Sequence, residues 1–199
     1  MTDLITDDAE FYLKHFEGLD LAEQTLASRT FESCTFLRCS FSDAVLERCK
    51  FIECTFRSCD LSNAKVTLSK WQETSFDECK LLGIDWTRAD WPRFTAPGKL
   101  IFRKSNVSYA SFFGLDLQEI TLEECKAHSV DLREGNFSKS NFSYTDFAES
   151  LFGKTKLMGV DFTEATNYLI DIQANQVKGA KFSRAEAFGL LYGLDVELV

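Results

Sequence analysis

The chain has 199 residues, of which 45% are hydrophobic and 27% are charged, so it is long enough for one repeat domain or for one to two globular domains. Its 31 acidic and 22 basic residues give a net charge of -9, which disfavours nucleic acid as a ligand and favours a basic protein surface as an electrostatic partner. Nineteen phenylalanines against two prolines is an unusual composition that points to a repeated pattern.

Residues 1–15 precede any regular spacing, and we expect them to form an N-terminal cap. They contain Asp3, Asp7 and Asp8 and no basic residue before Lys14, so they lack the basic start and the apolar stretch of a secretory signal. No stretch of the chain approaches the length of a transmembrane helix. The sequence therefore predicts a cytoplasmic protein without a membrane partner.

Every fifth residue from Phe16 to Trp91 is apolar. Neither a helix nor a strand keeps one face apolar at this spacing, so the chain must turn once every five residues. After a shift of one residue the spacing resumes from Phe102 to Phe182, where Asn167 is the one polar member and is expected to need a buried hydrogen-bond partner. The main core centres are predicted to be Phe16, Phe31, Phe36, Phe51, Phe56, Trp71, Phe76, Trp91, Phe142 and Phe162.

The residue two before each centre is expected to point inward as well, because side chains two apart in an extended chain share a side. This position is mostly small, and it holds all seven cysteines: Cys34, Cys39, Cys49, Cys54, Cys59, Cys79 and Cys125. Cysteines 20 residues apart would stack with parallel side chains in a reducing compartment, which favours free thiols over disulfides. Their spacing also does not suit a zinc site, so thiols packed as small apolar groups are predicted.

The five-residue units resemble those of the pentapeptide-repeat family, as Cys54–Ser58, Ser140–Tyr144 and Thr145–Glu149 illustrate. The resemblance extends over residues 16–186 and implies an all-β fold, a right-handed four-sided β-helix with four units in each coil. Residues 20 apart have similar sizes, which agrees with four units per coil. The repeat would then form about eight coils spaced by ~4.8 Å.

The spacing breaks between Trp91 and Phe102, which are eleven residues apart where two units need ten. One interpretation of residues 92–101 is a one-residue bulge at a corner. The alternative is a projecting partner contact, because irregular segments on a rigid scaffold often carry binding. The residues that we consider for partner binding are Asp90, Arg93, Phe94 and Lys99, together with the acidic Glu23 and Asp43.

The C-terminal residues 183–199 depart from the repeat. Ser183–Glu186 has the form of a capping box before a short predicted α-helix that Gly193 would end, and residues 196–199 are predicted to form a strand. These elements are too apolar to face water, which favours an end-to-end dimer over a monomeric cap. The expected dimer contacts are Phe188, Leu190, Leu191, Tyr192, Leu194, Val196 and Leu198.

No motif in the sequence indicates an enzyme. Phosphate loops, nucleophile elbows and dinucleotide fingerprints are missing. His15 and His128 fall at outward positions distant in sequence, and neither has a partner that suggests a catalytic role. A filled rod also lacks the usual kind of substrate pocket. We therefore expect no enzymatic activity, no catalytic residue, no metal, no cofactor and no small-molecule substrate.

Within the pentapeptide-repeat family, the chain is most similar to quinolone- and albicidin-resistance proteins, and to the albicidin type in particular. The likeness lies in the phenylalanine- and cysteine-rich composition and in residues 82–92, 167–172 and 190–198. It implies a dimeric rod that imitates duplex DNA, binds DNA gyrase or topoisomerase IV, and protects that enzyme from inhibitors such as quinolones or albicidin. The alternative is a scaffold for protein–protein interaction without a topoisomerase role.

Two features limit the imitation of DNA. Two chains of net charge -9 carry a charge of about -18 and, placed end to end, would be about 76 Å long. B-DNA of that length carries roughly 45 negative charges, at one per 1.7 Å. The longest quinolone-resistance relatives also have sizeable projecting loops, and here the spacing departs by only one residue. The sequence therefore predicts a partial mimic that relies on its size and on local acidic patches.

Overall fold

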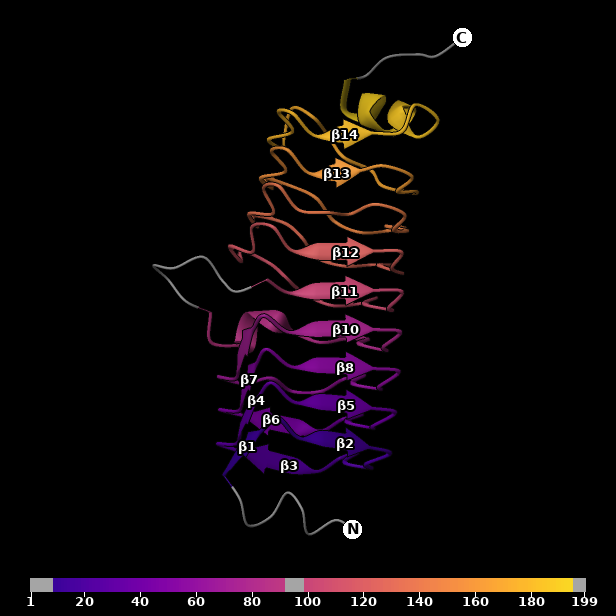
Figure 1. The fold of residues 1–199 in the computed structure, drawn as a ribbon. Helices are drawn as coiled ribbons and strands as arrows, with labels where there is room; N and C mark the ends of the chain where they lie inside the picture. Colours follow the sequence, from indigo (N-terminus) through magenta and orange to yellow (C-terminus); the bar gives the residue numbers. More distant parts are fainter. Residues whose placement is uncertain (1–8, 92–98, 195–199) are drawn as a thin grey trace.

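The computed structural model describes residues 9–91 and 99–194, without the side chains of residues 192 and 193. These residues form a right-handed four-sided β-helix of about eight coils, which confirms the predicted all-β fold. The coils stack along one axis, with the first coil at one end of the rod and the last coil at the other (Figure 1).

The strands are short because the chain turns at each of the four corners of a coil. They are β1 (Glu10–Tyr12), β2 (His15–Glu17), β3 (Thr25–Ala27), β4 (Thr30–Glu32), β5 (Thr35–Leu37), β6 (Val45–Glu47), β7 (Lys50–Ile52), β8 (Thr55–Arg57), β9 (Lys70–Gln72), β10 (Ser75–Asp77), β11 (Ile101–Arg103), β12 (Thr121–Glu123), β13 (Asp161–Phe162) and β14 (Lys181–Phe182). Two 3-10 helices are also described, η2 (Trp86–Arg88) and η3 (Ala187–Leu194).

Each strand pairs in parallel with the strand one coil away. We number the sides of the rod in chain order: the first contains β1, β4, β7 and β9, and the second contains β2, β5, β8, β10, β11 and β12 (Figure 1). The third side is held by single bridges such as Asp20 with Ser40, and the fourth contains β3 and β6. Four five-residue units therefore close one coil.

The interior consists of columns of stacked side chains. Phe36 lies 4.6 Å from Phe56 in the next coil, with the rings 10° from parallel, and meets the neighbouring column edge-on through Phe31 at 5.3 Å. Such ring pairs add about 0.5–1.5 kcal/mol each beyond the burial of their area. The predicted core centres are buried apart from Trp91, which is half-buried but still packs against the core.

The corners depend on an uncommon backbone conformation. In the described residues, 25 non-glycine residues have positive φ values between 48° and 63°, and all but Asn167 follow the five-residue spacing on either side of its break. Valine, isoleucine and threonine do not occur among these 25 residues, because branching at Cβ clashes with the backbone in this conformation. The repeat thus limits its corner position to residues such as Glu53, Ser58 and Asn63.

The small inward position binds the backbone of the preceding coil. The Cys54 thiol donates to the carbonyl of Phe31 at 3.3 Å, and the Thr145 hydroxyl donates to the carbonyl of Leu122 at 2.7 Å. All seven cysteines are buried and free, as predicted. Burial raises the pKa of the Cys54 and Cys125 thiols to about 12, which suppresses the reactive thiolate.

The first coil begins earlier than the sequence suggested. Strand β1 lies within the expected cap of residues 1–15 and pairs in register with β4. Phe11 is buried and its ring stacks on Phe31 at a distance of 5.0 Å. The start at Phe16 was therefore five residues too late: Phe11 lies one unit before Phe16 and has the small Ala9 two residues before it.

The break in spacing is larger than one residue. Phe76 is the register partner of Phe102, 26 residues away, whereas Phe56 and Phe76 are 20 apart. Between Trp91 and Phe102 the chain thus uses six more residues than a coil needs. The interpretation as a one-residue bulge is wrong. Six extra residues equal one five-residue unit plus one residue, so the spacing along the sequence reveals only the one odd residue.

The repeat also breaks at Asn167, which we expected in the interior. Asn167 is exposed with a φ of 56°, and the next residue, Tyr168, is buried in its place between Phe162 and Phe182. Burying an amide without a partner is costly, whereas asparagine tolerates positive φ and the tyrosine ring packs well. Because Phe162 and Phe182 remain register partners, the frame recovers within one coil.

The C-terminal end differs from the sequence prediction in its local geometry. The helix is a 3-10 helix rather than an α-helix, and it still includes Gly193. Ser183 does not form the expected capping box, since its hydroxyl contacts the Glu164 backbone N–H and carboxylate in the preceding coil. A Cβ at Gly189 would lie 2.9 Å from the Tyr168 carbonyl, so this glycine allows the helix to approach the last coil.

Candidate partner-binding surface

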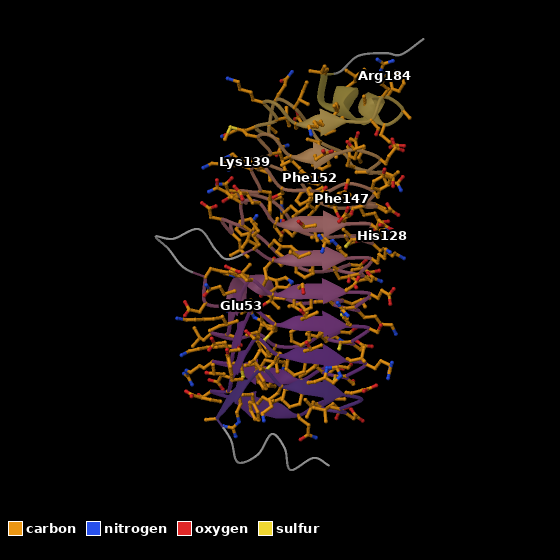
Figure 2. All side chains as sticks on the ribbon, in the orientation of Figure 1. Glu53, His128, Lys139, Phe147, Phe152 and Arg184 are labelled. Atoms are coloured by element: carbon orange, nitrogen blue, oxygen red, sulfur yellow. The ribbon has the colours of Figure 1, made fainter. Side chains whose placement is uncertain are left out.

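The interior is filled with side chains, so the outer surface is the candidate functional site. Side chains cover all sides of the rod, and Phe147 and Phe152 lie within the outline of the coils (Figure 2). In residues 9–91 and 99–194, no group of three or more His, Cys, Asp or Glu residues could hold a metal ion. Nor does this part of the chain contain a helix with the length and apolar character needed to cross a membrane.

Opposite charges are paired along the rod. Arg103 Nε lies 3.0 Å from Glu123 Oε2 and Lys181 Nζ lies 3.1 Å from Asp161 Oδ2, each pair linking neighbouring coils. Such exposed pairs contribute about 0–1 kcal/mol each. They leave a mixed surface on which local excesses of one charge, and not the net charge, determine where a partner docks.

The structure brings Glu23 and Asp43 together. Both are exposed corner residues with positive φ, located at the same corner of the first and second coils. Asp20 and Asp60 lie on the third side beside this corner, in the first and third coils. These four carboxylates form the acidic corner, which is a candidate contact for a basic surface.

Asp90 and Lys99 flank residues 92–97 in sequence, and both are exposed. Asp90 belongs to the first side, where its carboxylate lies 3.4 Å from Lys70 Nζ. Lys99 precedes the buried Leu100 and strand β11 on the second side. These two residues are therefore not part of the acidic corner. Arg93 and Phe94, the other predicted contacts in this segment, lie outside the described residues.

His128 has a partner that the sequence did not reveal. Its Nε2 lies 2.6 Å from Asp146 Oδ2, and the other Asp146 oxygen accepts a bond from Asn167 Nδ2 at 2.8 Å. Burial alone would raise the pKa of Asp146, but the bonds from Asn167 and His128 outweigh it and lower that pKa. The sequence did not reveal this contact, since a residue 18 positions away becomes a neighbour only when coils stack.

Arg133 forms a second polar cluster on the fourth side. It binds Asp131 through two hydrogen bonds of 2.9 and 2.8 Å, and its guanidinium lies 5.8 Å from the centre of the exposed Phe113 ring. These hydrogen bonds lower the pKa of Asp131. A planar cation held over an exposed ring is typical of the residues on which protein partners dock.

The C-terminal end presents part of the predicted dimer contact. Phe188 is 64% exposed, whereas Leu190 packs against the core and Leu191 and Leu194 are half-buried. The yellow helix η3 covers the last coil (Figure 1). Val196 and Leu198 lie outside the described residues, as does the side chain of Tyr192. Helix η3 thus covers the end of the core and still exposes an aromatic side chain.

Together these features define a class of protein: a filled four-sided rod built from five-residue units, with a mixed, locally charged outer surface. Residues 9–96 match the family model described as the pentapeptide repeat region. Residues 9–96 are therefore a pentapeptide repeat region, and the coils that follow them continue the same stacking. No curated protein sequence matches the chain significantly.

The chain is similar to several solved structures. Full-length QnrB1, a plasmid-mediated fluoroquinolone resistance protein, is 20% identical with a TM-score of 0.72, and the alignment covers 94% of this chain and 100% of that chain. A trypsin-treated QnrB1 variant is 23% identical with a TM-score of 0.65, covering 98% and 93%. HetL from the cyanobacterium Nostoc is 19% identical with a TM-score of 0.38, covering 87% and 86%.

Proposed function

We propose that this chain is a non-enzymatic protein that binds a type II topoisomerase, DNA gyrase or topoisomerase IV, and modulates its response to inhibitors such as quinolones or albicidin. The observation that carries the proposal is the similarity to QnrB1 over the whole length of both chains. Because the alignment covers 94% of this chain and 100% of QnrB1, a partner of QnrB1 would meet a body of similar dimensions here.

The shape and charge of the rod support binding in place of DNA. Nine residues of the second side, from Phe16 to Phe182, stack at about 4.8 Å per step and give a rod of roughly 38 Å. A surface that binds DNA is basic, and the acidic corner of Asp20, Glu23, Asp43 and Asp60 complements it. The proposed contact is therefore electrostatic in origin and partial in its imitation of DNA.

An end-to-end homodimer would double this length. The exposed Phe188 on η3, directly above the last coil, gives the chain an apolar end that a second copy would cover. A symmetric pair of rods would present two acidic corners at its far ends, which suits a partner that is itself two-fold symmetric. We include the dimer in the proposal for this reason.

A gyrase supercoiling assay with and without a quinolone tests the proposal. We expect the purified chain at micromolar concentration to inhibit supercoiling or to restore it in the presence of the drug, and this effect should weaken as salt is added. Reversing the acidic corner with Glu23→Lys and Asp43→Lys should weaken it about tenfold, because two favourable charges become unfavourable. The matched control is Glu134→Lys and Glu149→Lys, exposed corner residues at the other half of the rod.

Unchanged supercoiling and unchanged drug sensitivity at that concentration would exclude the topoisomerase role. The chain would then be a binding scaffold for another protein. Equal losses from the corner variant and the control variant would retain topoisomerase binding but remove the acidic corner from the contact.

A further inference from the structure

Two lysines stack in one column on the first side of the rod. Lys50 of β7 is the register partner of Lys70 of β9, so two lysines lie directly opposite on neighbouring parallel strands. Like charges in this arrangement reduce stability. The adjacent coil has the uncharged Thr30 at the same position, which shows that the fold does not require a lysine there.

The cations of this column are only partly neutralised. Lys70 contacts Asp90 at 3.4 Å, and Arg48 contacts its neighbour Glu47 at 2.8 Å. Within the described part of the chain, Lys50 has no carboxylate within 4.0 Å. The excess of positive charge therefore remains available to an external anion.

These side chains surround an open groove of about 300 Å³, lined by Arg48, Lys50, Leu68, Lys70 and Asp90. We call it the basic groove. It offers three cations against one carboxylate, on a chain whose net charge is -9. Leu68 is 49% exposed at the corner, so the groove also contains one apolar contact.

A second hollow adjoins the basic groove and extends to Asn63 and Gly83, at the corner between the third and fourth sides. It measures about 420 Å³, and Lys65, Thr67 and Arg88 are among its lining residues. Thr67 adjoins Leu68 in sequence, so the two hollows lie over consecutive residues of the same coil. Its lining contains one carboxylate, Asp85, which is bound by Arg88 at 3.2 Å. The surface is thus long enough for an extended segment of chain.

We propose that the basic groove binds an extended acidic segment of a protein partner, with carboxylates at Arg48, Lys50 and Lys70 and an apolar side chain on Leu68. The excess cations complement carboxylates, and Leu68 complements an aliphatic side chain, which a sugar–phosphate backbone does not provide. A duplex would also extend far beyond the Debye length of about 8 Å and meet the net negative charge of the rod. An acidic peptide a few residues long meets only the local positive field.

This site goes beyond topoisomerase binding and does not rest on it. A DNA-binding surface is itself basic and would be repelled by the basic groove, so the acidic partner is a different one. The groove lies around the corner between the fourth and first sides, whereas the acidic corner lies between the third and fourth. The rod therefore has the means to hold two partners of opposite charge on separate corners.

Fluorescence anisotropy with the full chain tests this proposal, using a labelled peptide of alternating Glu and Leu as the probe. The peptide should bind and should be released as salt is raised, whereas a peptide with Gln in place of Glu should not bind. Lys50→Glu with Lys70→Glu should weaken binding about tenfold. The control is Lys156→Glu, an exposed lysine at the same position of its unit on the same side, which should leave affinity unchanged.

Three outcomes would overturn the proposal: no binding of the Glu peptide, an equal loss with Lys156→Glu, or tighter binding of a short DNA duplex than of the peptide. The double variant should still act on gyrase as the unmodified chain does. Failure of the peptide assay is therefore distinguishable from failure of the topoisomerase proposal.

Thermal unfolding of Lys50→Thr provides a second test that does not depend on the probe. Because threonine occupies the same position in the adjacent coil, the variant should fold and should raise Tm by about 1–2 °C as the like-charge contact is removed. Peptide affinity should fall at the same time. A lower Tm would show that Lys50 supports the fold, and that result would overturn its assignment to binding.

Discussion

At the scale of single residues, stacking gives each side chain two neighbours 20 positions away, and these neighbours determine its chemistry. Ser129 donates to Glu149, and Ser33 donates to Glu53, across adjacent coils. The thiols and hydroxyls inside the rod are likewise held by the backbone of the coil before. Many polar groups of the repeat are therefore satisfied by contacts between adjacent coils.

Asp131 provides a prediction of pH dependence. Its contact with Arg133 lowers the pKa of Asp131 below the ordinary value of 3.8, so the pair stabilises the folded state above that pH and stops doing so as the pH falls through the acid range. Asp131→Asn should lower Tm at pH 7 by about 1–3 °C and have no effect near pH 2. Circular dichroism melts between pH 2 and pH 7 measure this change in Tm.

A matched control for this variant is Asp116→Asn. Asp116 occupies the same position of its unit, but its side-chain partners are the amides of Gln118 and Asn136. Its substitution should not change the slope of Tm against pH. If both variants show the same pH dependence, the Asp131–Arg133 contact is not its source.

The cysteines give a prediction about reactivity. All seven are buried, and burial raises the pKa of most of them, so a thiol reagent at pH 8 should label fewer than about one thiol per native chain. In concentrated guanidinium chloride all seven should react. Rapid labelling of several thiols in the native chain would show that the coils open locally or that these residues do not point inward.

At the scale of the elements, a coil tolerates the insertion of extra residues. Residues 92–97 interrupt it, yet the strands on either side keep their register, because Phe76 and Phe102 still stack at 5.0 Å. Neighbouring coils hold each other through parallel ladders, so an insertion at a corner costs little beyond the entropy of closing a longer loop.

Deleting residues 92–97 tests both the geometry and the role of this segment. The deletion restores a spacing of five residues from Trp91 to Phe102, and we expect the chain to fold with Tm unchanged or raised by a few degrees. If the segment is a partner contact, gyrase inhibition or protection should weaken in the same variant. Loss of folding would contradict the assignment of the six extra residues, and unchanged gyrase activity would place the contact elsewhere on the rod.

At the scale of the whole molecule, the two ends of the rod decide its assembly. A repeat of parallel strands has open edges at both ends, which must be covered to prevent uncontrolled association. Helix η3 covers the last coil but leaves Phe188 exposed. A second copy is the partner that would complete this cover symmetrically.

Light scattering after size-exclusion chromatography tests the dimer. We expect a mass of about twice the 22.7 kDa of one chain, and Phe188→Glu should reduce it to that of a single chain because a charge would be buried at the contact. Phe113→Glu, which changes an exposed phenylalanine in the middle of the rod, should remain dimeric. A single-chain mass for the unmodified protein would remove the dimer from the proposed function.

The sequence by itself determined the fold, because five-residue spacing of apolar side chains has one physical solution, a coil that turns at every unit. It also placed Phe36, Phe56 and the seven cysteines inside, since each of these positions depends only on local spacing. Columns of like residues 20 apart were already visible in the sequence, and the lysines at 50 and 70 form one such column that a search for repeated charge would have found.

Only the tertiary structure decided the features that depend on which units stack. The six-residue insertion is hidden in the sequence because its length differs from one unit by a single residue. The burial of Tyr168 in place of Asn167 is hidden because the two residues are adjacent in one unit. The contact of His128 with Asp146 and the groove between Arg48 and Lys70 arise between coils. Spacing along the chain defines each unit, but the alignment of coils fixes which surface residues meet, and that alignment depends on contacts 20 or more residues apart.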